Sequence, residues 1–168
     1  MEMRPPIQGL FDLIEISDQD RLLLKSRADQ TEAWADEFVN MFYDTLFAYP
    51  HTRALFRDGE RPHREKTLKD WYLQIVRGEF NDQFWHDQMR ISDRHIERQI
   101  LNSYMLGMMH RTQRFFFAKC LATFPQEDAK KIFSAFKAVT DIVAGIIAEG
   151  YHNPYAVRKV PTYHIEAK

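Results

Sequence analysis

The sequence predicts an all-α fold, and three observations support this. Apolar residues recur at helical intervals, three and four positions apart, along several long stretches. No stretch alternates apolar and polar residues, as a half-buried strand would. Only six glycines and seven prolines occur among the 168 residues, which leaves room for long helices. We therefore expect about seven or eight helices packed into one globular bundle.

Caps and composition divide the chain into three parts. Residues 1–16, which include a double proline, are predicted to form an N-terminal arm or a short helix. Ser17 is followed by acidic residues, a pattern typical of a helix N-cap. The main helical domain is expected over residues 17–151. Residues 152–168 are mixed and polar and contain two prolines, which predicts a C-terminal tail or the stub of a linker.

A strongly amphipathic helix is predicted over residues 31–48. Tyr43 lies beside its apolar stripe, which holds Trp34, Phe38, Met41, Phe42 and Thr45. Pro50 ends this helix and is expected to begin a short one over residues 51–56.

Further helices are predicted towards the C-terminus. One covers residues 63–77, and a short aromatic segment follows over residues 81–89. The segment that contains His95 is expected to be separate from it. Two long helices, at residues 100–123 and 125–150, complete the bundle.

Composition and motifs exclude several classes of protein. The formal net charge of −1 gives no support for binding to nucleic acid or to an anionic membrane. Charged residues break every apolar stretch before about 18 residues, and no signal peptide is found, so we expect a cytoplasmic protein without a membrane span. The single Cys120 rules out an internal disulfide. The common zinc, nucleotide-binding and serine-hydrolase motifs do not occur.

His95 has a setting that differs from those of the other six histidines. Ile91, Ile96 and Ile100 surround it, while the charged residues near it point elsewhere on a helical wheel. Spacing alone favours a core histidine bonded to a backbone carbonyl. The alternative is a ligand of heme iron, because a neutral imidazole is the usual proximal ligand.

Two hydroxyl groups are candidates for contact with a bound gas. Tyr43 is either an ordinary buried tyrosine or a distal donor to bound O2, where one hydrogen bond contributes roughly 1–3 kcal/mol. Thr67 lies on the apolar face of its helix and is a smaller candidate donor. Its alternative is a hydrogen bond back to a carbonyl of its own helix.

Three groups of residues carry a resemblance to a known family. The first is Phe42-Tyr43-Asp44 with Leu46, continued by Pro50, Thr52, Arg53, Ala54, Leu55 and Phe56. The second is Arg90-Ile91 followed by His95, and the third is Tyr104, Leu106 and Gly107. From about Leu10 to Tyr151 the chain resembles the sensor globins, a family that includes globin-coupled sensors, single-domain sensor globins and protoglobins.

The resemblance implies a globin-like fold over residues 17–151 around a heme b. It implies that His95 is the iron ligand, that Tyr43 is the distal donor, and that Thr67 occupies a second distal position. Other pocket residues implied in the same way are Phe42, Leu46, Phe56, Arg64, Leu68, Trp71, Tyr104 and Met108. His63 is close enough to be a second axial ligand in the ligand-free state.

The chain departs from the family pattern at two places. Arg98-Gln99-Ile100 and Asn102 follow the proximal histidine, where the family usually has Ile-Gly-Leu and a proline. Arg64 falls near a distal position that is usually aliphatic.

The resemblance favours a heme-based sensor of O2, with CO and NO as further ligands. Such a protein would signal through a homodimer, or through an output domain or partner. Two alternatives stay open at this point. One is a heme enzyme, such as a nitric oxide dioxygenase or a peroxidase, and the other is a helical interaction module without a cofactor.

Overall fold

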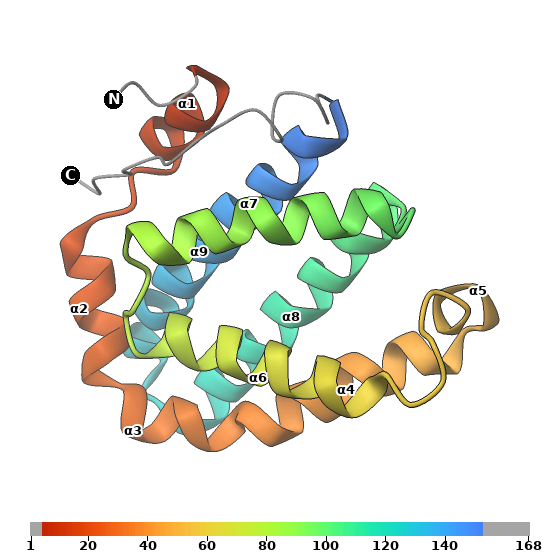
Figure 1. The fold of residues 1–168 in the computed structure, drawn as a ribbon. Coiled ribbons are helices and arrows are strands. Elements are labelled where there is room, and N and C mark those ends of the chain that lie inside the picture. Colours follow the sequence, from red (N-terminus) through yellow and green to blue (C-terminus); the bar gives the residue numbers. More distant parts are fainter. Residues whose placement is uncertain (1–4, 153–168) are drawn as a thin grey trace.

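The computed structural model describes residues 5–152, and within this range every regular element is a helix (Figure 1). The expected all-α class is therefore confirmed. Residues 153–168, which hold nearly all of the predicted tail, lie outside the described residues. The elements are α1 (Pro5–Ile14), α2 (Asp18–Ser26), α3 (Ala28–Thr31), the 3-10 turn η1 (Glu32–Trp34), α4 (Ala35–Ala48), α5 (Pro50–Arg53), α6 (Arg61–Val76), α7 (Asp82–Glu97), α8 (Asn102–Thr123) and α9 (Gln126–His152).

Two predicted boundaries were wrong. The aromatic segment and the His95 segment form one continuous helix, α7, rather than two. The side chain of Asn81 caps this helix by accepting a hydrogen bond from the backbone N–H of Phe84 at 3.1 Å, and no glycine or proline interrupts the helix afterwards. The short helix α5 ends at Arg53, three residues earlier than predicted.

The predicted cap at Ser17 is confirmed. Its hydroxyl accepts from the backbone N–H of Asp20 at 3.3 Å, and the Asp20 carboxylate accepts from the backbone N–H of Ser17 at 2.9 Å. This reciprocal pair is a capping box, and it fixes where α2 begins.

Gly78 is required where α6 ends. Its φ is +68°, and a Cβ atom there would lie 2.6 Å from the carbonyl oxygen of Arg21. Only glycine meets both demands, so the chain can turn from α6 towards α7 close against α2.

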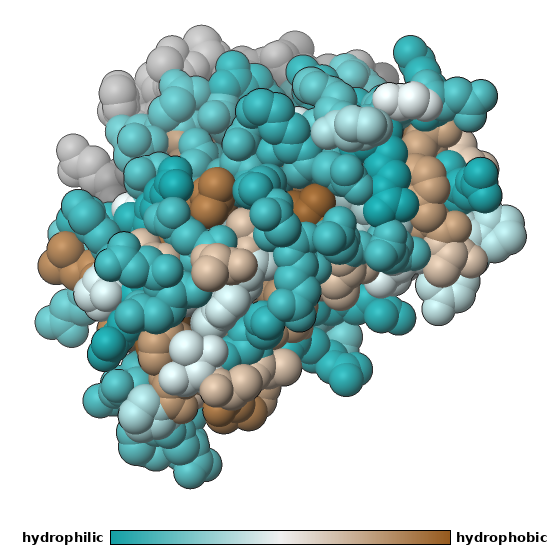
Figure 2. All heavy atoms as spheres, turned by 90° about the horizontal axis from the view of Figure 1, so that it is seen from below, coloured by the Kyte–Doolittle hydropathy of each residue, from teal (hydrophilic) through white to brown (hydrophobic). Residues whose placement is uncertain are grey.

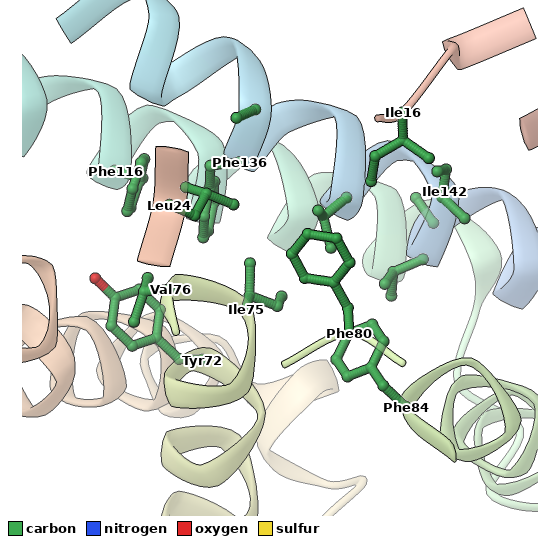
Figure 3. Close-up of a cluster of buried hydrophobic side chains, with 14 of the residues drawn as sticks. Ile16, Leu24, Tyr72, Ile75, Val76, Phe80, Phe84, Phe116, Phe136 and Ile142 are labelled. Carbon is green, nitrogen blue, oxygen red and sulfur yellow. The ribbon is translucent and has the colours of Figure 1, made fainter. Parts of the chain in front are cut away.

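The core lies where the ends of α6 and α7 meet α2, α8 and α9. Figure 3 shows aromatic and branched side chains from these elements converging on one cluster. Phe116 and Phe136 stack with ring centroids 3.8 Å apart, and both side chains are fully buried. The hydroxyl of Tyr72 reaches out of this cluster and donates to the carbonyl of Thr31 at 2.8 Å. The cluster thus holds α6, α8 and α9 to one another.

Helices α7 and α9 pack closely near their C-terminal ends. A Cβ atom at Gly150 would lie 2.0 Å from the Ser92 hydroxyl, so glycine lets the two backbones approach. The buried Ser92 hydroxyl donates to the carbonyl of Ile147 at 3.2 Å. These contacts fix the part of α7 that carries His95.

The arrangement leaves two groups of helices facing each other. In Figure 1, α7 runs across the upper side, α4 and α6 run across the lower side, and α8 passes between them. The face seen from the side of α3 and α4 is mostly hydrophilic, with separate apolar spots between charged side chains (Figure 2). No helix among residues 5–152 is both long and apolar enough to cross a membrane.

Candidate functional site

His95 lies in the last turn of α7, and its ring orientation is fixed by the backbone. Its Nδ1 lies 2.8 Å from the carbonyl oxygen of Ile91. A carbonyl only accepts hydrogen bonds, so in the neutral ring Nδ1 carries the hydrogen and donates it. The lone pair of Nε2 is then available to a ligand or a metal.

Burial keeps this ring neutral. Removal of the ring from water lowers the pKa of His95, and the positive charges of Arg64 and Arg98 lower the pKa further. The hydrogen bond to Ile91 opposes these effects and does not outweigh them. Near neutral pH the ring therefore has the protonation state that coordinates iron.

The chain after His95 is held in a defined turn. Gln99 has a φ of +56°, and the backbone N–H of Ile100 donates to the His95 carbonyl at 3.0 Å. This arrangement closes the end of α7 without the glycine that helix ends commonly use. The hydroxyl of Tyr151, on α9, donates to the Ile100 carbonyl at 2.5 Å, which ties the turn to the last helix.

Tyr43 projects from α4 and is 6% exposed. Its ring packs on Phe42 and Phe56, with centroids 5.4 and 5.9 Å away. Within the described part of the chain, the Tyr43 hydroxyl makes no hydrogen bond. Desolvation raises the pKa of Tyr43, so the phenol stays protonated and can donate.

A network of charges lies beside Tyr43 and His95. Glu60 accepts from Arg64 at 2.6 Å and also from Arg98 of the α7 end. These hydrogen bonds lower the pKa of Glu60 to about 2, so the carboxylate is ionised throughout the neutral range. The network joins the beginning of α6 to the end of α7. The positive charge of Arg64 lowers the pKa values of both Tyr43 and His95, so Arg64 lies near both residues.

The other predicted pocket residues fall into two groups. Five half-buried apolar side chains pack against the core on the side of α4 and α6, namely Phe42, Leu46, Phe56, Leu68 and Trp71. Two lie on α8, where Tyr104 and Met108 are half-buried. Trp71 also donates its indole N–H to the buried Gln88 at 3.1 Å, which links α6 to α7.

Thr67 and His63 lie on α6 and are both exposed. The Thr67 hydroxyl donates to the His63 carbonyl at 3.0 Å, which is the helix-internal bond considered from the sequence. Among the described residues, no hydrogen bond joins the side chain of Thr67 or His63 to His95.

A model of the protoglobin family matches residues 5–156, which is nearly the whole chain. The chain belongs to the protoglobin family. No protein of curated function matches the sequence.

Solved structures agree with this membership at the level of the fold. The chain of this protoglobin is similar to the globin domain of a Geobacter sulfurreducens globin-coupled sensor. The TM-score is 0.79 at 22% identity, over 87% of this chain and 97% of that one. It is also similar to the globin domain of E. coli DosC in its ferric form (TM-score 0.69, 10% identity, covering 82% and 99%) and its ferrous form (0.68, 13%, covering 87% and 99%). At these identities the likeness shows a globin fold.

The donor set of this protoglobin fits a heme. One nitrogen of His95 is fixed by the backbone and the other is left with its lone pair. The Tyr43 side chain is 6% exposed and its hydroxyl makes no hydrogen bond among the described residues, and half-buried aromatic and aliphatic side chains lie around it. This combination of one fixed imidazole, one phenol and an apolar surround suits a large flat cofactor that carries iron.

Glu60 and Arg98 were not predicted from the sequence as functional residues. The four-residue spacing of Glu60 and Arg64 is a signal that could have shown half of the network. The other half, Glu60 with Arg98, spans 38 positions and depends on how the fold brings the beginning of α6 to the end of α7.

Proposed function

We propose that this protoglobin domain binds heme b and senses a diatomic gas, with O2 as the principal ligand. One observation carries the proposal, namely the imidazole of His95 with Nδ1 fixed by Ile91 and Nε2 available. The ferric and ferrous forms of the DosC globin domain, a fold relative, support iron chemistry in this fold.

Each side chain has a separate role in this proposal. When bound, heme supplies an iron that coordinates O2, CO or NO. His95 holds the cofactor, and its hydrogen bond to Ile91 sets the ring orientation. Tyr43 donates a hydrogen bond to the polar gas ligand, and its apolar neighbours exclude water.

Transmission is proposed to pass through α9. Two contacts that flank His95 reach this helix, from Ser92 to Ile147 and from Tyr151 to Ile100. A shift of His95 would therefore act on the end of α9, which leads to the C-terminus. Helix α8 leaves Leu106, Phe117 and Leu121 exposed, which supports a homodimer or a contact with an output partner.

The His95→Ala variant tests the ligand assignment. We expect loss of the heme or a changed ferric spectrum, because the imidazole fixed by Ile91 has been removed, while the helical circular dichroism is kept. His110→Ala is a matched control, since His110 is exposed on α8, and its spectrum should equal that of the wild type. A His95→Ala protein with one heme per chain and an unchanged spectrum would refute the assignment.

The Tyr43→Phe variant tests the distal role. We expect O2 to dissociate about tenfold faster, which corresponds to one lost hydrogen bond, with heme content unchanged. Stopped-flow measurement of the ferrous protein gives this rate. Tyr49→Phe, at an exposed tyrosine near the end of α4, should leave the rate unaltered. Equal rates in wild type and Tyr43→Phe would remove Tyr43 from the proposal.

A further inference from the structure

A cavity open to the surface lies near the proposed gas site. Its volume is about 420 Å³, and its lining comes from the end of α4, from α5 and from the connection to α6. This volume is in the range of small-molecule sites, roughly 300–1,000 Å³. Because neither Tyr43 nor His95 lines it, the cavity is a different place from the one assigned to heme.

Two aromatic rings supply apolar surface in this cavity. Phe47 and Phe56 are both half-buried, and their centroids are 5.1 Å apart with planes tilted by 33°. The guanidinium of Arg61 lies 5.0 Å from the ring centroid of Phe47, so a cation already stacks on that ring. The rings leave apolar surface that a planar ligand could cover.

The charges of the cavity are mostly positive. Arg61 is neutralised by Asp44 at 2.7 Å and by Glu65 at 2.6 Å. Arg53 and Arg57, by contrast, form no ion pair within the described part of the chain. They stand four positions apart, with Asp58 as the one carboxylate in the lining. The lining itself therefore holds three arginines and one carboxylate, and two of these arginines are unpaired among the described residues, which favours an anion over a cation.

We propose that this cavity binds a small aromatic molecule that carries one acidic group, such as a phosphate monoester. The ring packs on Phe47 and Phe56, and the acidic group accepts hydrogen bonds from Arg53 and Arg57. This binding does not depend on heme or on the assignment of His95.

The cavity shares one wall with the gas site. Phe56 lines the cavity and also contacts the ring of Tyr43, with centroids 5.9 Å apart. A ligand that presses on Phe56 therefore acts one side chain away from the proposed distal donor.

Isothermal titration calorimetry with adenosine 5′-monophosphate on the purified full chain tests the proposal. In buffer at roughly physiological ionic strength, where surface attraction is screened, we expect saturable binding of one molecule per chain. Adenosine, which lacks the charge, and inorganic phosphate, which lacks the ring, should each bind at least about tenfold more weakly.

A pair of double variants locates the site. Arg53→Gln with Arg57→Gln should weaken binding at least about tenfold, because both charged donors are lost. Arg111→Gln with Arg114→Gln is the matched control, since these two exposed arginines of α8 also form no ion pair among the described residues, and its affinity should equal that of the wild type.

Three results would overturn the proposal. The first is the absence of saturable binding at millimolar nucleotide. The second is an affinity for adenosine or phosphate equal to that for the nucleotide. The third is an equal loss of affinity in the two double variants. All four exchanged arginines are exposed, so the variants are expected to fold.

Discussion

The two ends of α6 differ in what surrounds them. Tyr72, Ile75 and Val76, near its C-terminal end, have no exposed surface and belong to the apolar cluster of Figure 3. None of the first ten residues, Arg61–Asp70, is buried, and five carboxylate–cation pairs among the described residues involve them. One helix is therefore held in the fold at one end and presents charges and half-buried apolar side chains at the other.

Helix α7 shows the same division in the opposite direction. Phe84 and Trp85 in its first turn are almost completely buried, whereas His95 in its last turn is half-buried. In both helices one end belongs to the apolar cluster, and the other carries side chains of the candidate site, Arg64 on α6 and His95 on α7. This separation lets a family keep a globin fold while the residues around its site change.

The largest effect is expected in the packed region, with Phe136→Ala. Loss of the fully buried ring leaves a cavity beside Phe116, and unfolding should require about 3–5 kcal/mol less free energy. Urea denaturation followed by circular dichroism measures this change. Leu22→Ala is the control at an exposed apolar side chain, because Leu22 is 54% exposed and its loss should cost about 1 kcal/mol or less. Equal costs would show that the two regions are packed alike.

A smaller loss is expected at the charged network, with Glu60→Gln. The side chain of Glu60 is 12% exposed and serves two arginines, so its neutralisation should cost about 1–3 kcal/mol near pH 7. Glu127→Gln, at an exposed pair with Lys130, is the control and should cost about 0.5 kcal/mol or less. A cost at Glu60 no larger than at Glu127 would mean that the network does not hold α6 to α7.

The same variant has a defined dependence on pH. The folded-state pKa of Glu60 is about 2, below its ordinary value of 4.5, so the folded state favours the ionised carboxylate. Its contribution is complete above pH 4.5 and is lost as the pH falls towards 2. The difference in unfolding free energy between wild type and Glu60→Gln should therefore shrink over this interval, as denaturation at several pH values would show. A difference that stays constant down to the lower limit would contradict this pKa.

Local signals in the sequence predicted most of the fold. The apolar stripe of α4 and the cap at Ser17 depend on residues a few positions apart, and each lies where it was predicted. The sequence did not predict that α7 is one continuous helix. Its residues change from aromatic to charged, and this change resembles a helix boundary if Gln88 and Ser92, which are buried, are taken as polar surface residues.

The site was predictable only in part. His95 was chosen because of its apolar neighbours and a family resemblance. The bond to a backbone carbonyl, expected for a core histidine, is present at Ile91 and fixes the ring. The pairing of Glu60 with Arg98 and the bond from Tyr151 to Ile100 join residues 38 and 51 positions apart. Such contacts exist only after the helices have packed, and a single sequence carries no local signal for them.

The smallest effect is expected for Thr67→Val, which separates the two candidate hydroxyl donors. Thr67 is exposed and its hydroxyl is already bonded to the His63 carbonyl, whereas the Tyr43 side chain is 6% exposed and its hydroxyl makes no hydrogen bond among the described residues. We therefore expect the O2 dissociation rate of Thr67→Val to stay within about twofold of the wild type, against the roughly tenfold rise for Tyr43→Phe. Stopped-flow measurement of both variants under the same conditions makes the comparison. If the O2 dissociation rate rises as much in Thr67→Val as in Tyr43→Phe, the Thr67 hydroxyl also contacts the gas. The two hydroxyls would then share the distal role.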